Sequence, residues 1–466
     1  MAPRKKVCAH QKLCVDVSDH GRNVVGFEWI PADKRAAATT RSGRATEAGG
    51  SAPDVSTFPG PLVLPGDELA MNPKYPPQSL RSWVNGGYRN PITPERKTLY
   101  VVDLPGIDES AGFMREWAEP DIDEFVDRKE FPRLEHPDVG DLMAYLGAFY
   151  HPLPVKKLPT PLKFVRWNDG KKGEEKPSMV GLMMGSDIAV GIRARPSPDE
   201  IARMQLNLND LLDALRSILP KGAYASVMVL AHDLYEDEDD DFCCGRAYGG
   251  SRISLVSSFR YRPDLDAAFD VEIEHMWPTS HCAAFIDDFC KRNAEEEDGK
   301  GKKRKRAGGS KAASEGNSLL DLKKTPGTPM GAAISESKKV LVPKTKKDQR
   351  GMWFSRVART AAHELGHCFG LDHCVYYACV MQGTGGLGED ARQPPYFCPV
   401  CEAKLMYGLG EMGVVEGGKF GKWEEARDKE VLKERVEIMW GFCQGWKGVG
   451  MFAGFGEWLD VRLKEM

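Results

Sequence analysis

The feature that most constrains this chain is a cluster of metal-binding residue types that begins at His363 and ends at Cys401. Its first part, HELGHCFGLDH, places His363 and His367 four residues apart, on one face of a helix and one turn apart. Gly370 suits the end of that helix, because glycine tolerates the left-handed backbone conformation that stops it. The chain can then double back and deliver His373, so the spacing predicts three imidazoles around one zinc ion with an open fourth position.

Glu364 lies next to the first of these histidines, on the same helical turn. In that position its carboxylate is suited to accept a proton from a water molecule on the metal. The extended pattern H-E-x-x-H-x-x-G-x-x-H is far more specific than H-E-x-x-H alone. The alternative, three solvated or core histidines without a metal, is disfavoured by the complete spacing.

Four cysteines follow within the same stretch, and they form two short-range pairs: Cys374 with Cys379, and Cys398 with Cys401. Two such pairs are typical of a structural tetrahedral zinc site. Ordinary buried thiols are the main alternative, and disulfides a weaker one because nothing in the chain indicates an oxidising compartment. Met381, between the pairs, is suited either to underlie the histidine cluster or simply to fill the core.

Residues 363–401 resemble the archaemetzincin family, since every ligand type that the family motif requires is present. A looser similarity extends over residues 160–405 and over the segment around Pro73–Trp83. The resemblance implies an α/β (α+β) fold: a metzincin-like zincin catalytic domain with a mixed twisted sheet, a zinc-bearing active-site helix and a four-cysteine zinc subsite. It also implies two zinc ions per chain and aminopeptidase-like action on short peptides.

The same resemblance assigns a role to each motif residue. Glu364 is implied as general base and acid, and Met381 as the Met-turn. The implied ligands of the catalytic zinc are His363, His367 and His373, and those of the structural zinc are Cys374, Cys379, Cys398 and Cys401.

Composition excludes some classes of protein. The formal net charge is −4 over 466 residues, so the whole molecule is not a nucleic-acid binder by charge alone. No apolar run reaches the length of a membrane span, and the basic stretch Met1–Lys6 is followed by no apolar core of a secretory signal. We therefore expect a reducing compartment, cytoplasm or nucleus, where clustered cysteines bind metal rather than cross-link.

The chain before the catalytic region divides into three predicted segments. Residues 1–31 carry Cys8, His10, Cys14 and His20, which are zinc-capable types at a spacing that matches no standard finger, so both a small metal site and ordinary side chains stay open. Residues 32–70 are predicted to be a disordered linker, because small and polar residues dominate. Residues 71–160 form an accessory region, in which the proline-rich stretch 72–83 either wraps the core or lines a cleft.

Residues 161–290 are predicted to form the upper sheet part of the catalytic domain. A strand over 188–194, a helix from Ser197 to Ile218 and a strand over 225–231 read as a βαβ unit with parallel strands. We nominate residues 242–248 as an edge strand able to pair with an extended substrate, on the basis of the family resemblance. The acidic run 236–241 is interpreted as a solvated loop rather than a calcium site, and 275–282 as a packing segment.

The last part of the chain contains a composition change followed by the metal motifs. Residues 291–348 are predicted to be a disordered basic insertion, in which Lys302–Arg306 is either a nuclear or nucleic-acid signal or a plain linker. Residues 349–405 hold the active-site helix and the zinc-binding region, and 406–466 are predicted to be C-terminal helices.

The function predicted from these residues is zinc-dependent hydrolysis of peptide bonds in a peptide or protein substrate. Two alternatives stay open: a zinc-stabilised scaffold with an idle site, and a nuclear protein that associates with nucleic acid through the basic insertion. Membrane association is not expected, and the sequence does not indicate an oligomeric state.

Overall fold

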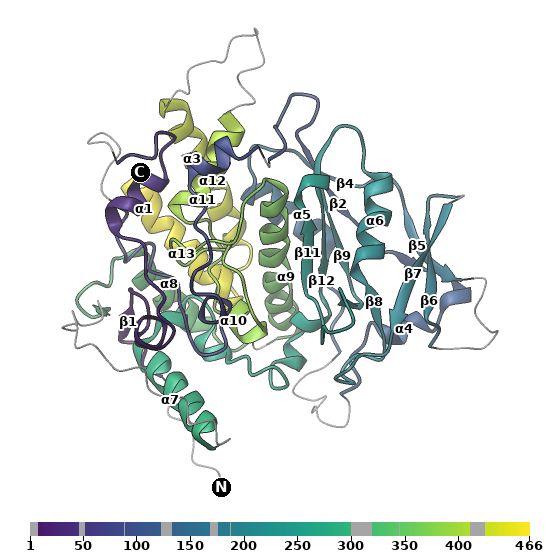
Figure 1. Cartoon of the computed structure of the whole chain (residues 1–466), viewed down its shortest axis with the longest axis horizontal. Helices are drawn as coiled ribbons and strands as arrows, with labels where there is room; N and C mark the ends of the chain where they lie inside the picture. Colours follow the sequence, from purple (N-terminus) through teal and green to yellow (C-terminus); the bar gives the residue numbers. More distant parts are fainter. Residues whose placement is uncertain are drawn as a thin grey trace.

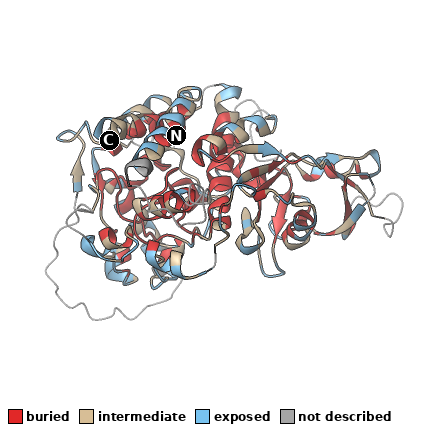
Figure 2. Ribbon diagram, turned by 90° about the horizontal axis from the view of Figure 1, so that it is seen from above, coloured by how far each residue is buried: buried red, intermediate tan, exposed pale blue. Residues whose placement is uncertain are grey.

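The computed structural model describes residues 8–45, 52–87, 89–122, 133–167, 176–186, 188–299, 319–343, 345–410 and 425–466. Two sheets lie side by side, and helices cover the outer face of one of them (Figure 1). Buried residues concentrate in the sheets and in the helices packed on them (Figure 2). The predicted α/β class is therefore confirmed in its coarse form, a mixture of sheets and helices. Within the described residues, no helix combines the length and apolar character that crossing a bilayer requires.

The sheet next to the metal-binding motifs has five strands, and their order is β11 (Gly245–Tyr248), β12 (Ile253–Ser257), β9 (Ala223–Leu230), β2 (Thr98–Val102) and β4 (Val155–Lys157). All neighbours pair in parallel except β11, which runs antiparallel to β12 at the edge. Every residue of β9 is buried, because both faces of the sheet are covered. Its side chains alternate: Val227 and Val229 join the core under the metal-binding motifs, whereas Met228 and Leu230 join the core shared with the second sheet.

The second sheet has six strands, in the order β10 (Asp233–Tyr235), β8 (Gln205–Asn207), β7 (Ile188–Arg195), β6 (Met179–Met184), β5 (Leu162–Arg166) and β3 (Gly106–Ile107). Helix α6 (Leu208–Ile218) packs between the two sheets, against β12 and β7. A short two-stranded ladder joins β1 (Lys12–Cys14) to β13 (Leu319–Asp321).

The predicted βαβ unit is wrong. β7 forms where the strand was expected, but it lies in the six-stranded sheet, whereas β9 pairs with β2 and β12 in the other. The helix also begins later than predicted, with Asn207 as its N-cap, because Gln205–Asn207 is taken up as β8. Ser197 caps no helix; its hydroxyl donates to the Asp199 carboxylate at 2.7 Å.

Helix α9 (Lys346–Cys368) carries the metal-binding motif, and it packs against β12, β11 and β9 (Figure 1). It begins with a capping box: the Thr345 hydroxyl accepts from the Asp348 amide at 3.1 Å, and the Asp348 carboxylate accepts from the Thr345 amide at 3.2 Å. Helices α5 (Val139–Phe149) and α13 (Gly450–Glu465) cover its other side. The helix is therefore held on both sides, which fixes the side chains of its last turn.

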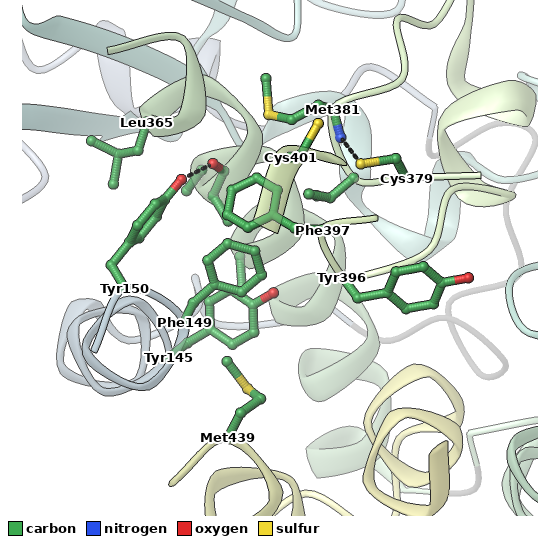
Figure 3. Packing of buried hydrophobic residues seen from close by; sticks show 14 of the residues in the cluster. Tyr145, Phe149, Tyr150, Leu365, Cys379, Met381, Tyr396, Phe397, Cys401 and Met439 are labelled. Carbon is green, nitrogen blue, oxygen red and sulfur yellow. Dashed lines mark hydrogen bonds between the residues drawn. The ribbon is translucent and has the colours of Figure 1, made fainter. Parts of the chain in front are cut away.

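An aromatic core anchors this helix from below. The Tyr150 hydroxyl donates to the carbonyl of Ala362 at 2.5 Å, one residue before the first motif histidine (Figure 3). The Tyr150 ring also stacks on Phe369, with ring centroids 5.0 Å apart. Phe149 and Phe397 pack beside it at 4.9 Å, so rings from α5 and from the loop before α11 meet under the site.

The remaining helices are short or lie at the periphery. They are α1 (Ala32–Ala38), α2 (Glu68–Met71), α3 (Leu80–Asn85), α4 (Met114–Trp117), α7 (Ala283–Gly299), α8 (Pro329–Ser337), α10 (Leu387–Ala391), α11 (Pro399–Gly410) and α12 (Glu425–Gln444). The last of these packs on α13 and α5, in agreement with the predicted C-terminal helices.

The predicted disordered linker over 32–70 is wrong in its described parts. Residues 32–38 form α1, and Phe58 is buried with its ring edge-on to Tyr396 and Trp458, at 5.5 and 5.4 Å between centroids. The Trp458 indole donates to the carbonyl of Thr57 at 3.1 Å. A few apolar residues in a polar stretch are thus enough to order the segment, because they pack against buried aromatic side chains such as Tyr396 and Trp458.

The predicted disordered insertion over 291–348 is likewise wrong where the structure describes it. Strand β13 completes the ladder with β1, and α8 packs against α13 with Met330, Ala333 and Ile334 buried. The basic cluster Lys302–Arg306 lies outside the described residues.

Candidate functional site

The last two turns of α9 present two histidines to a common point. The Nε2 atoms of His363 and His367 are 3.1 Å apart. Each ring is held from behind, because Nδ1 lies 2.6 Å from the Val380 carbonyl in His363 and 2.7 Å from the Leu371 carbonyl in His367. A carbonyl only accepts, so Nδ1 carries the proton and Nε2 keeps the lone pair that a metal ligand needs.

The turn after α9 brings in the third histidine. Gly370 has φ +75°, the left-handed conformation predicted from the sequence, and its amide donates to the His367 carbonyl at 2.9 Å. The chain reverses, and His373 Nδ1 lies 3.0 Å from the carboxylate of Glu68. The donor nitrogens of all three histidines lie within 4.8 Å of one another.

The environment keeps the two helical histidines neutral. Burial and the neighbouring imidazoles lower the pKa of His367 to about 4 and that of His363 well below its ordinary value. A neutral imidazole is the form that binds a metal, so these residues fit a zinc ion at neutral pH.

Glu364 lies beside this cluster and faces a cavity of about 370 Å³. Burial raises the pKa of its carboxyl group to about 8. Strand β11 forms one wall and approaches closely: a Cβ atom on Gly245 would lie 2.8 Å from Glu364 Oε1. Tyr261 and Gln393 also line the cavity. An acid–base group, a residue of the histidine cluster and the edge of a sheet therefore line the same cavity.

The acidic run 236–241 borders this cavity through Asp241. The Arg195 guanidinium holds the run, donating to the carbonyls of Asp237 and Glu238 at 3.1 Å each. The run is absent from the clusters of metal-binding side chains that the described residues form.

The four cysteines of the motif converge next to the histidines. Their sulfur atoms lie within 4.8 Å of one another, all four residues are buried, and every cysteine of the chain is a free thiol. Cys374 Sγ and Cys398 Sγ are 3.5 Å apart. Cys379 Sγ accepts from the Met381 amide at 3.4 Å (Figure 3) and from the Cys398 amide at 3.2 Å. Hydrogen bonds from the neighbouring thiols lower the pKa of Cys374. This donor set, with amides aimed at sulfur, fits a structural zinc ion.

Met381 packs under the helix that carries the histidines. A Cβ atom on Gly366 would lie 2.4 Å from Met381 Sδ, so only glycine permits this close approach. The Met381 carbonyl accepts from the Cys374 amide at 2.7 Å, which ties the two metal-binding clusters into one unit.

The proline-rich stretch 72–83 lies against the site. The Tyr75 ring is 5.8 Å from that of His373, and Gln78 donates to the Gly370 carbonyl at 3.0 Å. The Trp83 indole donates to the Phe369 carbonyl at 3.1 Å. The stretch therefore wraps the core beside His373, and none of its residues lines the cavity next to Glu364.

Sequence reasoning missed Glu68. It lies in α2, 305 residues before the histidine it contacts, and no motif links the two. The hydrogen bond with His373 lowers the pKa of the Glu68 carboxyl, so it is an ionised partner.

The N-terminal zinc-capable residues separate into two groups. Cys8 and His10 come together with His275, from the segment interpreted as packing. Cys14 lies outside that cluster, and its thiol donates to the Asp16 carbonyl at 3.1 Å. His20 is also outside it.

Two kinds of sequence comparison, with a family profile and with individual proteins, point to one group of proteins. A sequence profile of peptidase family M54 matches residues 329–407. Archaemetzincin-2 of Homo sapiens is 23% identical over 354 residues, which cover 75% of this chain and 70% of that protein, and the Pongo abelii protein matches equally. Archaemetzincin of Aeropyrum pernix is 36% identical over 74 residues, 16% of this chain and 40% of its own length. Among solved structures, archaemetzincin from Methanopyrus kandleri covers 68% of this chain and 97% of its own, at 16% identity and a TM-score of 0.30.

Proposed function

Because this chain belongs to the archaemetzincin family and is a zinc metallopeptidase, we propose that His363, His367 and His373 hold its catalytic zinc ion. The observation that carries the proposal is the convergence of three donor nitrogens, two of them on neutral, half-buried rings anchored through Nδ1. When bound, the zinc ion acidifies a water molecule and polarises the scissile carbonyl group.

Glu364 is proposed as the general base and acid. Its carboxylate accepts the proton of the attacking water and passes it to the leaving amine of the peptide. Burial, together with the nearby carboxylates of Asp390 and Glu236, raises its pKa to about 8, and a positive charge at the histidine cluster favours the carboxylate form that the first transfer requires. Gly245 and Tyr261 line the cavity in front of it.

The four cysteines are proposed to hold a second zinc ion with a structural role. Cys374 directly follows the third histidine, so fixing its sulfur also fixes the loop that delivers His373. The four thiols are buried next to an aromatic core, where water does not stabilise a thiolate charge. A bound divalent cation offsets the free energy needed to ionise them there.

We propose a peptide or protein as the substrate. Strand β11 is an edge strand that lines the cavity beside Glu364, so its free backbone groups are suited to pair with an extended chain. Tyr75 lies against the ring of His373, and we propose that the stretch 72–83 limits access on that side and so favours aminopeptidase-like action on short peptides. The cytoplasm or the nucleus is the proposed location, because twelve unpaired cysteines suit a reducing compartment.

The experiment that tests the catalytic proposal compares wild type with Glu364→Gln on a library of short peptides with free or blocked amino termini. We expect the variant to lose about 10²- to 10⁴-fold in kcat/KM while its zinc content is unchanged. Asp239→Asn, which removes an exposed carboxylate of the acidic run, is the matched control and should keep activity. Equal turnover by wild type and Glu364→Gln would instead favour the idle scaffold, and cleavage of blocked peptides would refute the aminopeptidase-like action.

Elemental analysis tests the second ion. Cys401→Ser should lose one equivalent of zinc and unfold at a lower temperature. Cys443→Ser, at an equally buried cysteine outside the cluster, should keep the wild-type zinc content.

A further inference from the structure

We propose that Cys8, His10, His275 and Cys282 form a further Zn²⁺ site, separate from the two in the motif region, that fastens the N-terminal segment to the loop 272–282. The donor atoms of Cys8, His10 and His275 lie within 4.8 Å of one another. Cys282 adds a second sulfur, 3.3 Å from that of Cys8. Two thiols and two imidazoles are a common donor set of structural zinc.

The two histidines are prepared in the same way as metal ligands. His10 Nε2 lies 3.1 Å from the Glu274 carbonyl, and His275 Nδ1 lies 3.0 Å from the Glu272 carboxylate. The other nitrogen of each ring, Nδ1 of His10 and Nε2 of His275, is buried and has no nitrogen or oxygen partner, and His275 interacts with the Cys8 thiol. Burying a ring nitrogen without a partner is unfavourable, and a metal ion that accepts both lone pairs removes this cost.

The sulfur atoms have the right separation for sharing an ion. At zinc–sulfur distances of about 2.3 Å, two tetrahedral ligands are about 3.8 Å apart, so the 3.3 Å contact must open by only a few tenths of an ångström. A disulfide requires about 2.05 Å, which the contact exceeds by more than an ångström.

The surroundings hold the ligands in place from several sides. The Cys8 amide donates to the Glu274 carboxylate at 2.5 Å, and Phe285 stacks on the His275 ring at 4.2 Å. Lys338 donates to the Ala9 carbonyl at 2.9 Å. Cys282 also forms a β-bridge with Leu13, so the site lies where β1 meets the start of α7 (Figure 1).

A consequence for the fold follows from this position. The residues joined are more than 260 positions apart in the chain. An ion at this point would tie β1, the β13 strand paired with it, and α7 together.

The test counts zinc in the full-length chain after loading and desalting. The variant Cys8→Ser/Cys282→Ser should hold one equivalent less than wild type. The matched control Cys14→Ser/Cys290→Ser changes one cysteine in β1 and one in α7, the elements next to the site, and should hold the wild-type amount. Because Cys282 is buried, the single Cys8→Ser variant, at a half-buried position, is measured in parallel, and it should show the same loss.

Thiol alkylation supplies an independent readout. In wild type, Cys8 and Cys282 should resist alkylation until a chelator is added. Equal zinc content in Cys8→Ser and wild type would overturn the proposal. Alkylation of both thiols without a chelator would also overturn it. So would alkylation only after reduction, because that result indicates a disulfide. His363→Ala tests the catalytic site separately. Whether or not this variant loses zinc, the zinc content of Cys8→Ser still decides the proposal for the N-terminal site.

Discussion

The contact between Glu68 and His373 leads to a prediction about zinc affinity. The two helical histidines are oriented by backbone carbonyls, which no substitution removes. His373 is oriented by a side chain, at 3.0 Å, so Glu68→Gln changes the orientation of one ligand only. The amide keeps the size of the side chain and an acceptor oxygen but removes the negative charge.

The magnitude follows from the exposure of the pair. Carboxylates behind a metal-ligating histidine contribute about 10- to 100-fold to metal affinity, or about 1.4–2.7 kcal/mol. The side chains of His373 and Glu68 are 29% and 26% exposed, so solvent screens part of the interaction. We therefore expect Glu68→Gln to weaken zinc binding at the histidine site by about 10-fold, the lower end of that range.

The assay is a titration of apo protein in zinc buffers, followed by the recovery of peptidase activity and by elemental analysis. Asp372→Asn is the matched control: it removes an exposed carboxylate next to His373 that contacts Gln78 and none of the three histidines. If Glu68→Gln binds zinc as tightly as wild type, the orienting role is wrong. If Asp372→Asn weakens binding equally, the effect is one of general charge.

Two further predictions concern the core and the cleft. Burial lowers the pKa of His232 to about 4, so the folded protein holds this side chain in its neutral form. The contribution of His232 to the free energy of unfolding is therefore fully present above the unfolded pKa of about 6.5 and falls as the pH drops below that value. Between pH 7.5 and 5.5 the protonation of this residue should lower the free energy of unfolding by about 1.3 kcal/mol. In denaturant titrations at both pH values, His232→Gln should make that decrease smaller by about 1 kcal/mol. A decrease equal to that of wild type contradicts the assignment. Gly245→Ala places a methyl group against Glu364 and should lower kcat/KM by up to about 100-fold at an unchanged melting temperature. Gly250→Ala, where a Cβ atom meets nothing within 4 Å, should leave both unchanged, and equal behaviour of the two variants would refute the steric argument.

The sequence alone determined the features that depend on local spacing. Two histidines four apart on a helix must share a face, and Gly370 adopts the left-handed conformation at the predicted end of α9. The order of histidines, cysteines and Met381 along forty residues predicted which side chains come together, because few residues separate them. The archaemetzincin resemblance was carried by the same short stretch.

The tertiary structure alone decided the contacts between distant parts of the chain. Glu68 behind His373, and His275 beside Cys8 and His10, join residues separated by 305 and more than 260 positions, and neither pair leaves a periodic signal in the sequence. The assignment of β7 and β9 to different sheets was equally invisible, because a strand pattern states which face is buried and not which neighbour it pairs with. Local geometry follows from backbone stereochemistry, whereas strand partners and long-range ligands are chosen by the packing of the whole chain.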